Sequence, residues 1–275
     1  LILKHKSHKS LKGFIKNMIK PINCSYSIDG EGPPLFLIHG IGAARDAWRF
    51  ILPNLIKKFT IISYDLRGHG SSPKSQYVFD LDDLVEDLEL LRHTTSFKTA
   101  FFAGHSLGGM IVPAYALKYP DHVKAIGLLS TAAGRTQEDK NKILTVIKLM
   151  EEEGIPQTLP SLVKRWFTDD FIKKFPEIIE KRIQQVADTD PDIFLNVFRI
   201  YANTEMQSWL HRISLPALVL TGENDGACNP RLNQLMVNEL KNSELTILPD
   251  LKHSILIEAP NLVSESLSNF FLKYN

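Results

Sequence analysis

One stretch decides the fold of this chain: residues 99–109, which read TAFFAGHSLGG. Its apolar first half predicts a buried strand, and residues 110–119 predict the helix that follows. Between them lies Gly-x-Ser-x-Gly, where Gly104 and Gly108 are needed because a Cβ there would collide with the neighbouring strand and helix. The sharp turn lifts the Ser106 hydroxyl above the sheet, so the sequence predicts Ser106 as a nucleophile.

Two residues far downstream supply the groups that such a serine needs. A serine hydroxyl is a weak nucleophile and requires a base, which in turn requires an orienting carboxylate. Asp225 comes just after a predicted strand, and His253 lies in the loop after the next strand. Because the carboxyl ends of parallel strands meet at one edge of a sheet, we expect Ser106, Asp225 and His253 to form a catalytic triad there.

Other acids and histidines fit these roles less well. Asp250 and Glu258 compete with Asp225, but they lie too near the candidate histidine in sequence to follow the preceding strand. His39 and His69 follow strands in glycine-rich loops, and we expect both of them to bond to the backbone. The triad assignment therefore stands on chain order and on position after strands.

The negative oxygen of a tetrahedral intermediate needs two backbone donors. One is expected to be the N–H of Leu107, directly after the nucleophile. The other is expected from Ile41, in the loop after the apolar run at 35–38. Glycines at positions 40 and 42 let that loop approach closely, so Ile41 and Leu107 are predicted to form an oxyanion hole.

A dinucleotide site is the competing interpretation of the same loop. Gly40-x-Gly42 after a strand, with Asp65 ending the next strand, resembles the start of a dinucleotide fingerprint. The third glycine is missing, because position 45 is Arg45, and a nucleotide site would leave the triad residues unexplained. The sequence therefore predicts neither a cofactor nor a metal.

The rest of the chain alternates strands and helices, which is typical of a mostly parallel sheet flanked by helices. The alternation stops within residues 135–213, where several helical stretches and no convincing strand occur. The expected strands lie at 22–28, 35–38, 60–64, 99–103, 125–130, 217–221 and 244–248, and the expected helices of the α/β part at 46–56, 81–92, 110–119, 231–240 and 262–272.

Composition excludes several classes of protein. Hydrophobic residues make up 44% and charged residues 23% of the 275 residues, as in an ordinary globular protein. No uncharged apolar run approaches the roughly 18 residues that a bilayer helix needs. The two cysteines, Cys24 and Cys228, are too far apart in sequence for a disulfide framework or a zinc motif, which fits a reducing compartment, and we expect the cytoplasm.

Charge is concentrated at the N-terminus. Six of the 32 basic residues lie within residues 1–20, which hold no acid, so the remainder has 26 basic against 31 acidic residues. A body of that sign is a poor nucleic-acid binder. Apolar residues from Leu11 to Ile19 recur at helical spacing, a pattern compatible with a membrane surface or a partner, although an extension outside the fold is the preferred interpretation.

Several motifs in order resemble the α/β-hydrolase family over residues 22–272. They read HGIG at 39–42, DLRGHGSS at 65–72, GHSLGG at 104–109 and GEND at 222–225, with His253 and the EAP of 258–260 beyond. The resemblance implies an α/β-hydrolase fold with a helical cap inserted after the sixth strand. It divides the chain into an extension at 1–21, a core at 22–134 and 214–275, and a cap at 135–213.

The cap sequence Arg165-Trp166-Phe167-Thr168 resembles that of 3-oxoadipate enol-lactonases and related small-ester hydrolases. Its apolar residues are expected to roof Ser106 and leave a pocket for small or medium acyl groups. Trp166 and Trp209 are the candidates for lining that pocket, and the alternative is that they anchor the cap to the body. Arg165 is the candidate for pairing with a substrate carboxylate, and the alternative is an exposed arginine. Where the family usually has glycine before its histidine, this chain has Lys252, a cation expected to depress the pKa of His253 if it lies near.

The leading hypothesis is a cofactor-free serine hydrolase that cleaves carboxylic esters or lactones through an acyl-enzyme on Ser106. Two alternatives remain: the same triad would serve C–C bond hydrolysis or perhydrolysis, and a hydrolase-shaped receptor would show little turnover. The expected partner is a small-molecule substrate. The sequence does not predict an oligomeric state.

Overall fold

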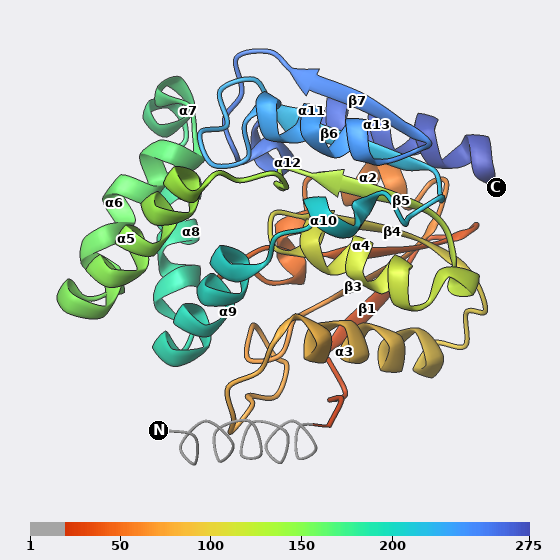
Figure 1. The fold of residues 1–275 in the computed structure, drawn as a ribbon, viewed down its shortest axis with the longest axis horizontal. Coiled ribbons are helices and arrows are strands. Elements are labelled where there is room, and N and C mark those ends of the chain that lie inside the picture. The colour runs from red at the N-terminus through yellow and green to blue at the C-terminus, as the bar shows by residue number, and fades with distance from the viewer. Residues whose placement is uncertain (1–19) are drawn as a thin grey trace.

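A seven-stranded sheet runs through the centre of the computed structural model, which describes residues 20–275 (Figure 1). The spatial order is β1-β3-β2-β4-β5-β6-β7. Only β1 pairs antiparallel, with β3, and the other pairs are parallel, as the sequence predicts. The strands are β1 Tyr26–Asp29, β2 Pro34–Ile38, β3 Thr60–Tyr64, β4 Ala100–His105, β5 Val123–Leu129, β6 Ala217–Gly222 and β7 Ser243–Leu248.

Helices cover both faces of this sheet because its central strands are apolar on both sides. In β2, Phe36 and Ile38 belong to one buried core, whereas Leu35 and Leu37 belong to the other. The first core is covered by α3 Leu81–Thr94, α4 Gly108–Lys118 and α11 Pro230–Glu239, and the second by the 3₁₀ helix Arg45–Trp48, α2 Leu52–Leu55 and α13 Pro260–Phe271. The short helices Pro120–His122, α12 Ile255–Glu258 and Leu272–Tyr274 complete the layers.

One predicted helix is wrong in form. Residues 46–56 were expected as a single helix, but the chain makes the 3₁₀ turn and then the separate helix α2. Pro53 lies at the start of α2 and has no N–H to bond to a preceding turn. A continuous helix through this segment would lose that hydrogen bond, so the helix restarts at the proline.

Six helices separate β5 from β6, and we call residues 135–213 the helical insertion. The helices within residues 137–203 stand together beside one end of the sheet, whereas the last, short helix at residues 207–210 lies near α4 and α11 (Figure 1). The insertion follows the fifth strand rather than the expected sixth, because only one strand, β1, precedes β2 within residues 20–275. The helices are α5 Gln137–Glu153, α6 Ile155–Trp166, α7 Asp169–Lys174, α8 Pro176–Ala187, α9 Pro191–Asn203 and α10 Gln207–Leu210.

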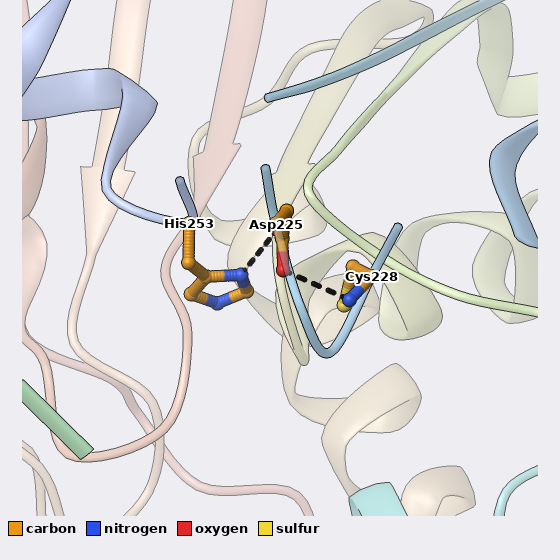
Figure 2. Close-up of side chains that lie close together, drawn as sticks. All are labelled: Asp225, Cys228 and His253. Atoms are coloured by element: carbon orange, nitrogen blue, oxygen red, sulfur yellow. Dashed lines mark hydrogen bonds and ion pairs between the residues drawn. The ribbon is translucent and has the colours of Figure 1, made fainter. Parts of the chain in front are cut away.

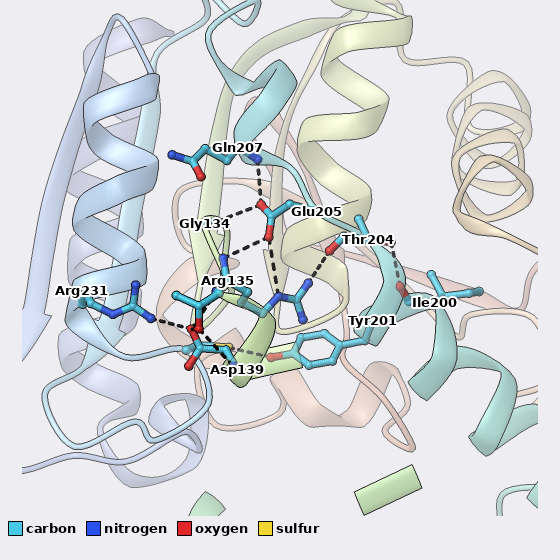
Figure 3. A network of polar contacts seen from close by, with 11 residues as sticks. Gly134, Arg135, Asp139, Ile200, Tyr201, Thr204, Glu205, Gln207 and Arg231 are labelled. Carbon is cyan, nitrogen blue, oxygen red and sulfur yellow. Dashed lines mark hydrogen bonds and ion pairs between the residues drawn. The ribbon is translucent and has the colours of Figure 1, made fainter. Parts of the chain in front are cut away.

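A single carboxylate joins the two ends of the helical insertion (Figure 3). Glu205 accepts the main-chain N–H groups of Gly134 at 2.8 Å and Arg135 at 3.1 Å on the entering segment. On the leaving segment it accepts the N–H of Gln207 at 2.9 Å. Arg135 also donates to the carbonyl oxygen of Thr204. The chain therefore leaves and rejoins the sheet layer at one place.

No helix within residues 20–275 is long and apolar enough to cross a membrane. The basic amphipathic pattern of the predicted extension falls on residues 1–19, which lie outside the described residues.

Candidate active site

The turn after β4 has the geometry that its glycines predict. Ser106 adopts the left-handed conformation, with φ of +56°, and its N–H donates to the carbonyl of Leu129 at 2.8 Å. A Cβ added to Gly104 would lie 2.1 Å from the main-chain oxygen of Gly108. A Cβ added to Gly108 would lie 2.0 Å from the oxygen of Ile38. Helix α4 and the end of β2 thus approach the turn so closely that only glycine fits.

Asp225 and His253 meet although each follows a different strand (Figure 2). Nδ1 of His253 lies 2.7 Å from Oδ2 of Asp225. The other carboxylate oxygen accepts the main-chain N–H groups of Ala227 at 3.1 Å and Cys228 at 2.9 Å. Asp225 is buried, so these donors replace the water that its charge would otherwise bind.

The pair shifts the titration of both members. Burial alone would lower the pKa of His253, but the Asp225 carboxylate outweighs burial and raises this pKa above its usual range. Burial would likewise raise the pKa of Asp225, and the imidazole and the two main-chain donors keep it below its ordinary value. The arrangement therefore stabilises a positive charge on His253, which forms whenever the ring accepts a proton.

Ser106 and His253 line one cavity of about 140 Å³, together with Ile41 of the loop after β2. Asp225 lies behind the His253 ring rather than in the cavity wall. The helical insertion supplies much of the remaining wall, including the apolar side chains Ile143, Val146, Leu162, Trp166 and Phe198. The predicted nucleophile and base thus line one cavity, which is partly open to solvent and has largely apolar walls.

Two main-chain N–H groups beside Ser106 have no acceptor among the described residues: that of Ile41, which lines the cavity, and that of Leu107, which directly follows the serine. Within residues 20–275, the N–H groups of Ile41 and Leu107 donate to no backbone or side-chain atom. A Cβ added to Gly40 would lie 3.0 Å from the Cβ of Ser106, so this loop runs directly against the serine. Ile41 and Leu107 can therefore donate to a charged oxygen formed beside Ser106.

The two loop histidines bond to the backbone, as predicted. Nε2 of His39 accepts the N–H of Leu66 at 2.9 Å, and Nε2 of His69 accepts the N–H of Gly42 at 3.3 Å. Burial lowers the pKa of His39 to about 4 and that of His69 to about 3, so both rings stay neutral.

Asp65, like these histidines, forms side-chain hydrogen bonds with the backbone. Its side chain accepts the main-chain N–H groups of Arg45 at 2.7 Å and Ser71 at 3.0 Å. It therefore holds the loops around it together, and the loop at 40–42 lies against Ser106 rather than at a dinucleotide site.

Two of the three residues predicted to line the pocket do so, and the third does not. Arg165 and Trp166, at the end of α6, line the cavity. Trp209 does not: it lies on α10 and packs against the core that α4 and α11 cover, so the prediction for Trp209 is wrong. The sequence shows that Trp209 is large and apolar and therefore expected to be buried. Which surface it packs against depends on the direction of the short helix α10, which the sequence does not show.

Lys252 also differs from expectation. Its ammonium group donates to the carbonyl oxygen of Lys164 at 2.9 Å and to Asp169 at 3.1 Å. The cation thus points to the helical insertion and ties it to the histidine loop. The pKa of His253 is raised by Asp225, not depressed by Lys252.

Sequence reasoning missed three residues beside the triad candidates: His105, Arg182 and Cys228. His105 contacts the main chain of His253, and the hydroxyl of Tyr201 lies 3.3 Å from the Sγ of Cys228. Asp225, Cys228 and His253 offer ligand-type atoms within 4.8 Å of one another, but the carboxylate is already bonded to the imidazole and to main-chain donors. No sequence motif marks these contacts.

Comparisons with known proteins agree with this architecture. A family model described as the α/β hydrolase fold matches residues 33–145. (E)-2-((N-methylformamido)methylene)succinate hydrolase of Acinetobacter baylyi is 26% identical over 246 residues, which cover 88% of this chain and 91% of that protein. 3-Oxoadipate enol-lactonase 2 of the same organism is 26% identical over 255 residues, or 91% and 94% of the two chains. A solved thermophilic esterase from Thermogutta terrifontis, with malate bound, is 26% identical, covers 92% of this chain and 94% of its own, and has a TM-score of 0.83.

Proposed function

We propose that this chain, a hydrolase with the α/β-hydrolase fold, cleaves carboxylic esters or lactones through an acyl-enzyme on Ser106. One observation carries the proposal. Ser106, held in a left-handed turn, lines the same cavity as His253, whose other ring nitrogen is bonded to Asp225. Nucleophile, base and orienting carboxylate are the groups that acyl transfer requires.

The proposed reaction has two halves. The Ser106 oxygen attacks the substrate carbonyl carbon while His253 accepts the serine proton, and Asp225 stabilises the resulting imidazolium. The N–H groups of Ile41 and Leu107 bind the negative oxygen. The tetrahedral intermediate then expels the alkoxide, which takes the proton from His253. Water repeats the attack on the acyl-enzyme and releases the acid.

The cavity supports a restricted range of substrates. Its volume of about 140 Å³ matches the size of a benzene ring rather than that of a long acyl chain. We propose that residues 135–213 act as a cap that forms this roof and excludes bulk water. Arg165, which lies at the cavity wall and is otherwise exposed, is the proposed partner for a substrate carboxylate.

The names of relatives support the same range. Those relatives are an enol-lactonase of an oxoadipate and a hydrolase of a substituted succinate, and the similar esterase was solved with malate. All three names refer to small acids or their derivatives. A small lactone or ester, carrying a carboxylate that reaches Arg165, is therefore the substrate class proposed here.

Labelling of the intact protein tests the proposal most directly. A fluorophosphonate should add one mass increment to the wild-type chain, and peptide mapping should place it on Ser106. Ser106→Ala should remain unlabelled and lose p-nitrophenyl acetate turnover by about 10³-fold or more. Activity retained by Ser106→Ala, or a ligand that raises the melting temperature without any turnover over a broad ester panel, would contradict a serine hydrolase.

A further inference from the structure

An arginine of the helical insertion holds the loop that carries Ile41. Arg182 lies on α8, and its Nη2 donates to the main-chain oxygen of Ile41 at 3.0 Å. Its Nη1 donates to the main-chain oxygen of Gly42 and, at 3.2 Å, to the side chain of Gln185. The guanidinium stacks over Trp166, with 4.9 Å between its carbon and the ring centroid.

The insertion touches this loop at more than one point. Gly42 has φ of +56°, and a Cβ added there would lie 2.5 Å from the ring of Phe194 on α9. The side chain of Ile41 packs against the apolar cluster of the insertion, which includes Leu162 and Val186. The loop is therefore shaped on one side by the insertion, through packing and through Arg182.

Residues of the α/β core make further hydrogen bonds to the loop at residues 40–42. The carbonyl of Gly40 accepts the N–H of Ala43 at 3.3 Å, and the ring of His39 contacts the same oxygen at 2.8 Å. The N–H of Gly42 donates to His69 at 3.3 Å. Arg182 takes the carbonyls of Ile41 and Gly42, and the N–H of Ile41, on the amino side of these carbonyls, is left without an acceptor among the described residues.

Arg182 makes no close ion pair among the described residues, although the carboxylate of Asp46 acts on it from a greater distance. Within residues 20–275, no carboxylate oxygen lies within 4.0 Å of its guanidinium, whereas its neighbour Lys181 reaches Asp46 at 3.9 Å. Burial lowers the pKa of Arg182 to about 10. Arg182 is half-buried at the cavity, and its hydrogen bonds to the loop carbonyls replace part of the water that its charge would otherwise bind.

We propose that Arg182 is a positioning residue for the oxyanion hole. It fixes the peptide planes on the carboxyl side of Ile41 so that the Ile41 N–H points at the oxygen that becomes charged. The inference rests on the proposed function, since it assigns a role within that reaction. It implies that the oxyanion hole is complete only when the helical insertion is docked on the core.

Steady-state kinetics with a neutral substrate test this role. Arg182→Met should lower kcat for p-nitrophenyl acetate by about 10- to 100-fold, since misplaced groups cost up to about 10² in rate, while KM changes less than about threefold. Arg182→Lys, whose ammonium can reach one carbonyl at a time, should give an intermediate kcat. The rate of fluorophosphonate labelling should fall in the same order. If Arg182→Met does not fold, the lysine variant alone decides, and wild-type kcat in it would overturn the proposal.

A matched variant separates position from charge. Lys164→Met removes an exposed cation from α6 that makes no side-chain contact with the loop, and it should leave kcat and KM unchanged. Wild-type kcat in Arg182→Met would overturn the proposal. So would a rise in KM confined to esters with a free carboxylate, because Arg182 would then bind substrate directly.

The wild-type protein distinguishes the two levels of failure. If it is labelled on Ser106 and turns over esters, but Arg182→Met behaves as wild type, only this inference fails. If the wild-type protein is neither labelled nor active, the proposed function fails and this inference with it.

Discussion

Nε2 of His105 lies 3.0 Å from the main-chain oxygen of His253. The residue that precedes the nucleophile therefore touches the backbone of the proposed base. Burial is the main cause that lowers the pKa of His105 to about 3, so its ring is neutral, and Nε2 must carry the proton that it donates to this carbonyl. The contact joins the turn of Ser106 to the histidine loop.

His105→Leu should break that connection. The half-buried carbonyl of His253 would lose its side-chain donor, at a cost of about 1 kcal/mol, and the histidine loop would lose its contact with the turn of Ser106. We expect kcat/KM for p-nitrophenyl acetate to fall by about 5- to 100-fold. His105→Gln keeps a side-chain N–H and should retain more activity; equal activity in the leucine variant would show that the contact is idle.

The pH dependence of turnover should follow His253. The base works only when its ring is neutral, so kcat/KM should be low at acid pH and rise as the ring loses its proton. Because Asp225 raises the pKa of His253 above its usual range, this rise should occur at higher pH than for a free histidine. The measurement is a pH profile of kcat/KM on p-nitrophenyl acetate.

Asp225→Asn should move the same rise to lower pH, because burial lowers the pKa of His253 and the charge of Asp225, the main group that opposes it, would be gone. Turnover should also fall by about 10⁴-fold, as when the orienting acid of another triad is lost. Asp250→Asn is the matched control: Asp250 is exposed, and it competes with Asp225 only in sequence. A shifted profile in that control would reassign the acid.

Trp166 should set the chain-length preference. The wild-type protein should turn over p-nitrophenyl acetate or butyrate faster than the palmitate ester, since the cavity is small. Trp166→Ala opens the roof and should change the ratio of these kcat/KM values more than it changes the melting temperature. Trp209→Ala should do the reverse, because Trp209 packs on the core. A palmitate preference, or an unchanged ratio in Trp166→Ala, would refute selection by the roof.

Gly108→Ala should destabilise the fold. The added Cβ would lie 2.0 Å from the main-chain oxygen of Ile38, and backbone at both sides of the turn would have to move. We expect the free energy of unfolding to fall by about 3 kcal/mol or more, measured by urea denaturation. Gly226→Ala introduces a Cβ with nothing within 4 Å, so its change should stay within about 0.5 kcal/mol. Similar losses in the two variants would disprove the steric explanation.

The sequence predicts the sheet and the turn of Ser106 because both depend on local rules. Apolar runs of strand length, a glycine two residues on either side of a serine, and the order of acid and histidine after strands are all visible in one dimension. All seven expected strands exist, with ends displaced by a few residues. The prediction that His39 and His69 bond to the backbone is also confirmed, because both follow strands in glycine-rich loops.

Features that depend on packing between distant segments were not predictable. Arg182 reaches Ile41 across 141 residues, and its sequence neighbourhood is an ordinary amphipathic helix. Trp209 was misplaced because a tryptophan in a short helix can face the pocket or the core with the same sequence. The prediction of one helix at 46–56 is wrong because it relies on the spacing of apolar residues and neglects the proline within the segment.

The junction at Glu205 has a consequence for how this architecture diversifies. Because the helical insertion starts and ends on one carboxylate, it behaves as a module that can be lengthened or exchanged without displacing a strand. Substrate range can then evolve apart from the nucleophile and its base. Arg182 limits that freedom: any replacement module must bring its own donor to the carbonyl of Ile41, or inherit this one.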